Sequence, residues 1–331
     1  MQSKLKSFFS GKKVLVTGVS GFVGTNLSKR LVDLGSSVIG VIHNRAPQLS
    51  LDEVDYKTAD LTIYENCLNV CQNVDYVFMC AANSSGAAVM ESAPLTHLTP
   101  NVVMNSYMLA AAYEQRVEKF AFISSNTVYP VTDFPVSEDD VTHVFFEKYQ
   151  IVGWMKLFSE EMCKMYSQHI KNPMSTLVVR PGNLYGPFDK YNTSESKVIA
   201  ALIRRFAEKQ SPLSVWGDGE DIKDFLYIDD FIEGLLQAFV AKNIHSPINL
   251  ASGIPVKIKD VIENLISISK DKNLEIYFDK SKPTMIPKRL ISIECAKNKL
   301  QWRPSVGLND GLKITYEWYR EFYKNSSPDN I

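Results

Sequence analysis

Short apolar segments alternate with amphipathic ones along most of the chain. The run Val14 to Val16 is brief and entirely apolar, which is typical of a strand buried on both faces of a parallel sheet. From Thr25 to Leu34, leucines recur on one side at helical spacing, and a second apolar strand is predicted from Val38 to Ile42. The strand, the helix and the second strand follow one another within about 30 residues. The pattern therefore predicts a βαβ unit near the N-terminus.

The same alternation continues through the following segments. A third short strand is predicted to end at Asp60-Leu61, and later strands are predicted at 75–80, 120–123, 175–179 and 248–251. The predicted helices lie at 64–71, 101–114, 149–170, 197–209, 231–240, 259–269, 293–299 and 307–325. This order predicts an α/β fold, a Rossmann doubly wound parallel sheet with a smaller, interleaved C-terminal substrate lobe. We assign residues 1–180 plus 225–252 to the dinucleotide-binding domain and residues 181–224 plus 253–331 to the substrate lobe.

Three glycines are spaced between the first strand and the first helix, in the stretch Thr17 to Gly24. Gly18 permits a tight turn off the strand, Gly21 lets backbone N–H groups approach a pyrophosphate, and Gly24 lets helix and strand pack closely. The helix N-terminus then offers unpaired donors and the positive end of its dipole to the anion. The turn therefore predicts a dinucleotide site. The residues that we expect to contact the cofactor here are Gly18, Ser20, Gly21, Phe22, Val23 and Gly24.

Residues at the ends of the next three strands are candidates for the rest of the cofactor site. An acidic residue after the second strand would accept hydrogen bonds from the ribose of NAD, but Asn44-Arg45 stands there instead. Arg45 could face the 2′-phosphate of NADP. Asp60-Leu61 ends the third strand, where the aspartate would meet the adenine edge. After the fourth strand, the small pair Ala81-Ala82 would let the backbone pass close to the nicotinamide half.

Composition and charge narrow the class of protein. Of 331 residues, 45% are hydrophobic and 22% are charged, which is the balance of an ordinary globular protein. The formal net charge of -1 gives no electrostatic reason to expect a nucleic acid or an anionic membrane as a partner. No apolar run approaches the roughly 18 residues of a membrane span, and the first residues lack a signal-peptide core, so we expect a cytoplasmic protein. Cys67 and Cys71 lie one helical turn apart without an accompanying histidine, which favours buried thiols over a metal site.

The chain as a whole resembles the extended short-chain dehydrogenase/reductase family, whose members act mainly on nucleotide sugars. The motifs that carry this resemblance are T-G-x-x-G-x-x-G at Thr17–Gly24, Asp60-Leu61, Ala81-Ala82, Asn101, Ser124-Ser125 and R-P-x-N-x-Y-G-P at Arg180–Pro187. The segments after Pro187 are most similar to the GDP-L-fucose synthase branch, so the implied substrate is a GDP-linked sugar. By this resemblance Arg205 and Lys223 contact the diphosphate or its sugars, and arginine can bind phosphate bidentately. The implied substrate-binding residues are Ser84, Asn183, Lys197, Val198, Arg205, Trp216, Lys223 and Arg289.

Members of the family carry a helix motif Y-x-x-x-K, in which the tyrosine transfers the proton and the lysine lowers the tyrosine pKa. By the match to this helix, Lys156 is the lysine, whereas Val152 stands at the tyrosine position. Valine cannot transfer a proton, so another group must replace the phenol. Lys156 in a desolvated pocket is one candidate, and Tyr149, one turn before Val152 on roughly the same face, is another. A water held by Ser125 and Thr127 is the third, and the resemblance gives Ser125 a hydrogen bond to the reacting group.

Two multi-step chemistries of the family lack their residues in this chain. The 4,6-dehydratases use an Asp-Glu pair where this chain has Asn126-Thr127. The GDP-fucose synthases epimerise with a cysteine and a histidine where this chain has Thr127 and Lys197. Threonine does not titrate near neutrality, and lysine does so only when strongly perturbed. Hydride transfer at a single carbon is the reaction that remains.

We therefore predict an NAD(P)-dependent oxidoreductase that oxidises carbon 4 of a GDP-linked hexose or heptose. It would be similar to the tyrosine-lacking GDP-manno-heptose 4-dehydrogenases of bacterial capsule pathways. An oxidising role favours NAD(H), although Arg45 leaves NADP(H) open. The alternatives are a 4-epimerase or 4-ketoreductase that uses Tyr149, and a catalytically silent protein that binds the cofactor and the sugar nucleotide.

The family also implies a homodimer that is held by a four-helix bundle. The two helices contributed by each subunit would be 101–114 and 149–170. Met104, Met108 and Ala111 form an apolar stripe that fits either this interface or the core of one subunit.

Overall fold

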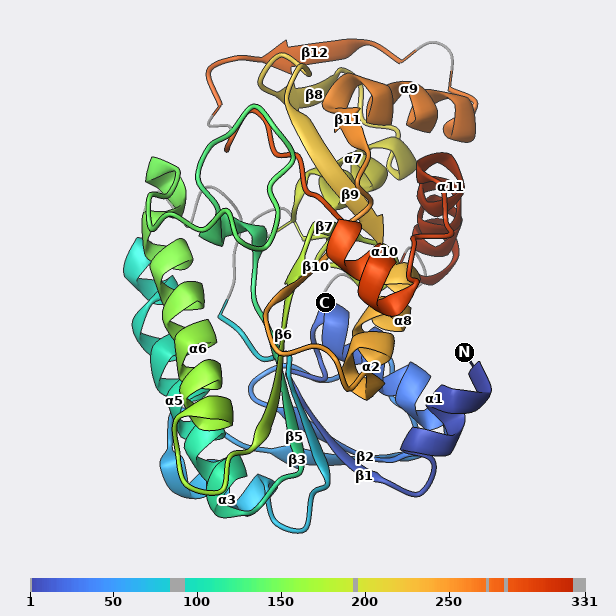
Figure 1. The fold of residues 1–331 in the computed structure, drawn as a ribbon. Coiled ribbons are helices and arrows are strands. Elements are labelled where there is room, and N and C mark those ends of the chain that lie inside the picture. The colour runs from blue at the N-terminus through green and yellow to red at the C-terminus, as the bar shows by residue number, and fades with distance from the viewer. Residues whose placement is uncertain (1, 84–92, 193–195, 272–273, 283–284, 324–331) are drawn as a thin grey trace.

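Parallel strands form a central sheet in the protein (Figure 1). A computed structural model describes residues 2–83, 93–192, 196–271, 274–282 and 285–323. Over these residues the sheet has seven strands, which are β1 (Lys13–Thr17), β2 (Ser37–Ile42), β3 (Val54–Thr58), β4 (Tyr76–Met79), β5 (Lys119–Ile123), β6 (Ser175–Pro181) and β10 (Ile248–Leu250). Their order is β10-β6-β5-β4-β1-β2-β3, and every neighbouring pair is parallel. This order confirms the predicted Rossmann sheet.

Helices cover both faces of the sheet because its strands are apolar on both sides. In β1, Val14 and Val16 belong to one core cluster, whereas Leu15 belongs to the other. The first face is covered by α1 (Gln2–Phe9), α2 (Phe22–Asp33) and α8 (Ile228–Val240), and the second by α3 (Tyr64–Val70), α5 (Thr99–Glu114) and α6 (Gln150–Gln168) (Figure 1). None of the helices that the structure describes has the length and apolar character needed to cross a membrane.

A second part of the molecule lies beyond the carboxyl ends of the strands (Figure 1). It contains a three-stranded sheet and a two-stranded sheet over the described residues. Its strands are β7 (Asn183–Tyr185), β8 (Leu213–Trp216), β9 (Ile222–Tyr227), β11 (Pro255–Lys257) and β12 (Ile276–Asp279). Its helices are α7 (Val198–Ala207), α9 (Ile258–Ser269), α10 (Glu294–Leu300) and α11 (Leu308–Trp318), which a π-helical turn at Tyr319–Tyr323 follows.

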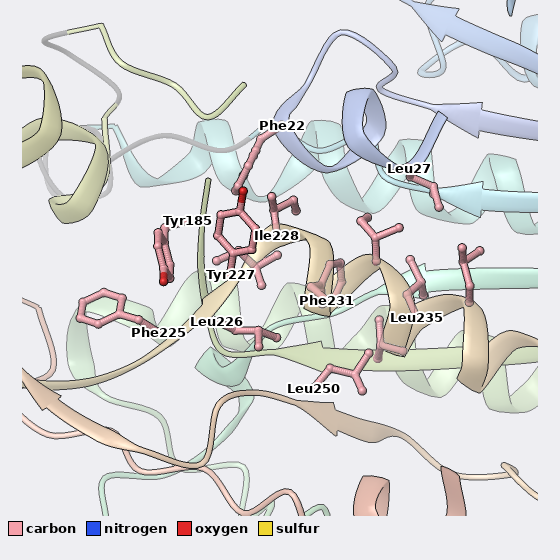
Figure 2. Close-up of a cluster of buried hydrophobic side chains, with 14 of the residues drawn as sticks. Phe22, Leu27, Tyr185, Phe225, Leu226, Tyr227, Ile228, Phe231, Leu235 and Leu250 are labelled. Carbon is pink, nitrogen blue, oxygen red and sulfur yellow. The ribbon is translucent and has the colours of Figure 1, made fainter. Parts of the chain in front are cut away.

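The two parts share one hydrophobic core. Figure 2 shows side chains from α2, β7, β9, α8 and β10 gathered in a single cluster of buried residues. The chain leaves the large sheet after β6, returns for α8 and β10, and then leaves it again. The boundary that we drew between residues 224 and 225 falls inside β9, and the division into two lobes stays a prediction.

Helix α1 is an element that the sequence pattern did not predict. It has eight residues, of which only Leu5 and Phe9 are buried, so its apolar periodicity is too short to stand out. Its aromatic residues nevertheless pack closely, since the ring of Phe9 lies 5.7 Å from that of Phe239 in α8. The tertiary environment, rather than the local pattern, therefore accounts for this helix.

Two sequence expectations about buried positions are settled by the structure. Cys67 and Cys71 are buried, and burial raises the pKa of each thiol to about 12, which confirms the interpretation as buried thiols. Met108 and Ala111 are fully buried, and Met104 packs against the same core cluster. Met108 and Ala111 therefore belong to the core of the subunit, whereas Met104 is only half-buried and the dimer through α5 stays a prediction.

Candidate functional site

The turn after β1 has a shape that lets a pyrophosphate approach the backbone. Gly18 has a φ of 64°, and a Cβ on this residue would lie 2.7 Å from the Cα of Ala81. A Cβ on Gly24 would lie 2.2 Å from the carbonyl oxygen of Gly18. Gly21 caps α2 without a side-chain hydrogen bond, so no capping side chain occupies the first N–H groups of this helix. The cradle therefore fits the diphosphate of a dinucleotide, which binds to bare backbone at a helix N-terminus.

Two side chains fix the end of β4 beside this turn. Oγ1 of Thr17 accepts hydrogen bonds from the backbone N–H groups of Cys80 at 3.1 Å and Ala81 at 3.0 Å. The side chain of Asn101 pairs with both backbone groups of Asn83, at 2.8 and 3.0 Å. The sequence analysis gave neither residue a role in the site, although both belong to the motifs of the family resemblance. The path expected for the nicotinamide half is therefore lined by a fixed backbone.

The loop after β2 is joined to the glycine turn. Oγ of Ser20 donates a hydrogen bond to the carbonyl oxygen of Arg45 at 2.7 Å. The side chains of Asn44 and Arg45 are exposed, as is Ala82 at the end of β4. The hydrogen bond therefore places Arg45 beside the glycine turn, where the adenosine half is expected.

Other expected cofactor residues are already engaged within the protein. Phe22 and Leu61 are buried in the core clusters, so only their backbones can face a cofactor, and Val23 is half-buried. The carboxylate of Asp60 accepts hydrogen bonds from the backbone N–H of Thr62 at 2.9 Å and from its hydroxyl at 2.7 Å. These bonds lower the pKa of Asp60, which keeps it ionised beside the site.

Lys156 of α6 lies at the carboxyl end of β5. Its Nζ donates a hydrogen bond to the carbonyl oxygen of Ile123 at 2.8 Å and lies 4.8 Å from the ring centroid of Phe122. Burial lowers the pKa of Lys156 to about 8, and the positive charge of Lys197 acts in the same direction. The carboxylate of Glu160, one turn further along α6, acts against them. With a pKa near 8, part of the amine is unprotonated at neutral pH.

A buried ion pair holds the carboxylate of Glu160. Arg180 donates to it through Nη2 at 2.6 Å and through Nε at 3.0 Å, and Ser124 donates to the same carboxylate. Arg180 also donates to the hydroxyl of Tyr129 at 3.0 Å. These donors offset the negative charge of Glu160. The carboxylate therefore only partly opposes the lowering of the Lys156 pKa by burial.

Helix α6, which carries the Val152 that we matched to the tyrosine position, packs against the turn after β5. Val152 and Lys156 share a face of α6 because they are four residues apart. A Cβ on the adjacent Gly153 would lie 2.9 Å from the carbonyl oxygen of Thr127. Oγ of Ser125 accepts a hydrogen bond from the backbone N–H of Thr127 at 3.2 Å, and the buried Thr127 hydroxyl has no partner among the described residues. Gly153 therefore brings the helix of Val152 and Lys156 against the turn that carries Ser125 and Thr127.

Tyr149 lies beside the C-terminal segment instead. It caps the N-terminus of α6, seven residues before Lys156, which corresponds to about 10 Å along the helix axis. Burial raises the pKa of Tyr149 to about 12, whereas the charge of Arg289 and the backbone N–H of Ile286 act to lower it. The structure thus groups Tyr149 with residues of the C-terminal segment and not with Lys156.

Lys223 and Arg289 are also anchored in this C-terminal region. Nζ of Lys223 donates to the carboxylate of Asp221 at 3.1 Å and to the carbonyl oxygen of Ile286. Arg289 is only 1% exposed, and its guanidinium donates to the two carbonyl oxygens of Tyr129-Pro130 at 3.0 and 2.7 Å. Arg289 therefore fixes the end of the turn that starts at Ser125 and Thr127.

The remaining expected substrate residues occupy neighbouring elements. Arg205 of α7 donates to a carbonyl oxygen of β8, and Trp216 at the end of β8 is exposed. Lys197 is exposed at the start of α7, directly before the half-buried Val198. Its positive charge contributes to the lowered pKa of Lys156. Asn183 donates to a carbonyl oxygen of β9 at 3.0 Å. The last member of the set, Ser84, lies outside the described residues.

Comparisons with known proteins agree with this arrangement. The model of the NAD dependent epimerase/dehydratase family matches residues 14–251. Over 316 residues the chain is 29% identical to GDP-mannose 3,5-epimerase 1 of Oryza sativa subsp. indica, with 93% of this chain and 82% of the relative covered. It is 25% identical to the GDP-L-fucose synthase of Escherichia coli strain K12, with 94% of this chain and 98% of that relative covered. A solved structure of UDP-glucuronic acid 4-epimerase from Bacillus cereus, in complex with UDP-glucuronic acid and NAD, has a TM-score of 0.82 and 27% identity, with 94% of this chain and 100% of that chain covered.

Proposed function

The chain belongs to the NAD dependent epimerase/dehydratase family, and we propose that it oxidises carbon 4 of a GDP-linked hexose or heptose with NAD as the cofactor. The observation that carries this proposal is the environment of Lys156, a desolvated amine with a pKa of about 8 on the helix that lacks the tyrosine. The GDP part is supported by relatives named for GDP-mannose and GDP-L-fucose. The NAD part is supported by the family description and by the glycine cradle after β1.

In this proposal Lys156 is the base that removes the hydroxyl proton. As a neutral amine, Nζ still donates one N–H to the carbonyl oxygen of Ile123, and its lone pair is left for the substrate proton. With a pKa near 8, roughly one amine in ten is neutral at pH 7. Bound NAD would supply the acceptor for the hydride that leaves the same carbon. Ser125 and the unpartnered hydroxyl of Thr127 are close enough to this helix to orient the reacting group.

The geometry weighs against Tyr149 as the proton-transferring group. Its neighbours are Arg289 and Ile286, whereas Lys156 lies about 10 Å further along the helix axis. A phenol with a pKa of about 12 is also a poor base at neutral pH, because its ionised fraction is very small. For these reasons we favour the dehydrogenase over the 4-epimerase or 4-ketoreductase that would use Tyr149.

A turnover assay with two substitutions tests the proposal. The purified protein is incubated with NAD and either GDP-mannose or GDP-manno-heptose, and the appearance of reduced nicotinamide and of a keto sugar is measured. Lys156→Met is expected to abolish turnover, whereas Tyr149→Phe is expected to retain it. Lys164→Met, which removes an exposed lysine from the same helix, is the matched control and should behave as the wild type.

Two results would contradict the proposal. If Tyr149→Phe abolishes turnover and Lys156→Met does not, the tyrosine-dependent alternative is favoured. If the wild type binds both ligands but yields no keto product with either sugar, the protein is a silent binding homologue.

A further inference from the structure

His97 is a buried histidine with one ring nitrogen that lacks a partner. It ends the 3-10 helix Pro94–His97, directly before α5, and is only 3% exposed. Its Nδ1 lies 3.2 Å from the carbonyl oxygen of Asn83. A carbonyl oxygen can only accept a hydrogen bond, so the ring proton belongs on Nδ1 and Nε2 carries a bare lone pair. Nε2 is buried and makes no hydrogen bond within the part of the chain that the structure describes.

The surroundings of His97 keep this ring uncharged. Burial lowers the pKa of His97, and the positive charge of Lys190 acts in the same direction, while the bond to Asn83 opposes them. The ring is therefore neutral at pH 7, and Nε2 is an acceptor. A buried acceptor without a donor costs free energy, so the site is complete only when a donor reaches Nε2.

The position of His97 identifies which ligand could bring this donor. Asn83 follows Ala81-Ala82 at the end of β4, where the nicotinamide half is expected, and Asn101 fixes its backbone. The turn that ends at His97 packs against α6, the helix of the proposed base. Lys190 lies three residues after Pro187, where the chain passes toward the substrate lobe. His97 thus stands between the expected nicotinamide site and the substrate lobe.

We propose that Nε2 of His97 accepts a hydrogen bond from a hydroxyl group of the bound sugar. A sugar hydroxyl is a neutral donor, which suits an uncharged acceptor, whereas the oxygens of a diphosphate only accept. The diphosphate is therefore excluded as the partner of His97, and the comparison of GDP-mannose with GDP separates a sugar hydroxyl from the donors of the nucleotide. The inference rests on the proposed function in taking a sugar nucleotide as the ligand, but it does not depend on the redox step.

Calorimetric titration of the NADH-loaded protein, whose cofactor cannot accept a hydride, with GDP-mannose and with GDP tests this contact without turnover. The wild type is expected to bind GDP-mannose more tightly than GDP. His97→Phe keeps a flat ring but removes the acceptor, so it should lose about tenfold in affinity for GDP-mannose and nothing for GDP. His97→Gln can present an amide oxygen as an acceptor and should recover part of that loss. His169→Phe, at an exposed position after α6, is the control for loss of a histidine elsewhere.

Several outcomes would overturn the assignment. An equal loss for GDP and GDP-mannose in His97→Phe would mean that the residue only supports the fold of the site. Unchanged affinities, or a wild type that does not bind GDP-mannose more tightly than GDP, would mean that no sugar hydroxyl reaches Nε2. The proposed function fails separately, because a protein that shows the His97-dependent preference but yields no keto sugar would contradict only the oxidation.

Discussion

The protonation state of Lys156 decides at which pH the proposed oxidation can occur. Burial lowers the pKa of this amine to about 8, and only the neutral amine can accept the hydroxyl proton. Below this value the neutral fraction falls about tenfold for each pH unit, and above it the fraction approaches one. We therefore expect kcat/KM to increase with pH up to about 8 and then to level off, and a pH profile of NAD reduction measures this.

The matched variant for this profile is Lys164→Met, which should leave its midpoint unchanged because that lysine is exposed. A rate that is independent of pH across this range would contradict the role of Lys156 as the base. If kcat/KM instead keeps increasing up to the ordinary pKa of lysine, the amine is solvated in the working enzyme and burial does not lower its pKa to about 8.

At the scale of elements, the contact between α6 and the turn after β5 holds the catalytic candidates together. Gly153 makes this contact possible, since a Cβ there would lie 2.6 Å from the ring of Phe145 and 2.9 Å from the carbonyl oxygen of Thr127. A side chain such as Phe145 can move, but a backbone carbonyl cannot do so without shifting the turn. The glycine therefore sets how closely α6, which carries Lys156, approaches the turn that carries Thr127.

Gly153→Ala is expected to reduce turnover more than it reduces stability. Alanine gains about 1 kcal/mol of helix propensity, whereas overpacking costs about 1–3 kcal/mol, so the net change in the free energy of unfolding is a modest loss. The forced displacement acts directly on the distance between Thr127 and Lys156. Urea unfolding and kcat/KM measure the two effects, and Gly307→Ala, whose Cβ would meet only the Asp310 carboxylate at 4.0 Å, serves as the control. Unchanged kcat/KM in Gly153→Ala would contradict the dependence on this contact.

At the scale of the whole molecule, the large sheet could be predicted from sequence because its signals are local. The glycine turn and the continuous apolar runs each indicate their own element, and the order of elements then determines the sheet. Helix α1 and strand β12 could not be predicted in this way. The eight residues of α1 bury only Leu5 and Phe9, and β12 has four residues that alternate poorly, so tertiary packing determines both.

Motifs indicated where the backbone of the candidate site would turn, but contacts between distant segments could not be predicted from the sequence. The match of Val152 to the tyrosine position predicts that the usual proton-transferring group is absent, and this stays a prediction. The sequence could not show that Tyr149 turns toward Arg289, because their contact joins segments about 140 residues apart. It also gave no sign of His97, whose unpartnered nitrogen is visible only once the carbonyl group of Asn83 is placed.

Helix α6 also exposes large apolar side chains on its outer surface, and these predict how two molecules associate. Trp154, Phe158 and Met165 are 45%, 49% and 52% exposed, and Tyr107 on the adjacent α5 is 37% exposed. Exposed aromatic residues on neighbouring helices are typical of an interface, so we expect the protein to dimerise through α5 and α6. Phe158→Glu places a charge in the centre of this surface and should convert the dimer to a monomer of 37.3 kDa in sedimentation experiments. Tyr277→Glu, on the distant strand β12, should leave the dimer intact, and a wild type that sediments as a monomer would contradict the interface.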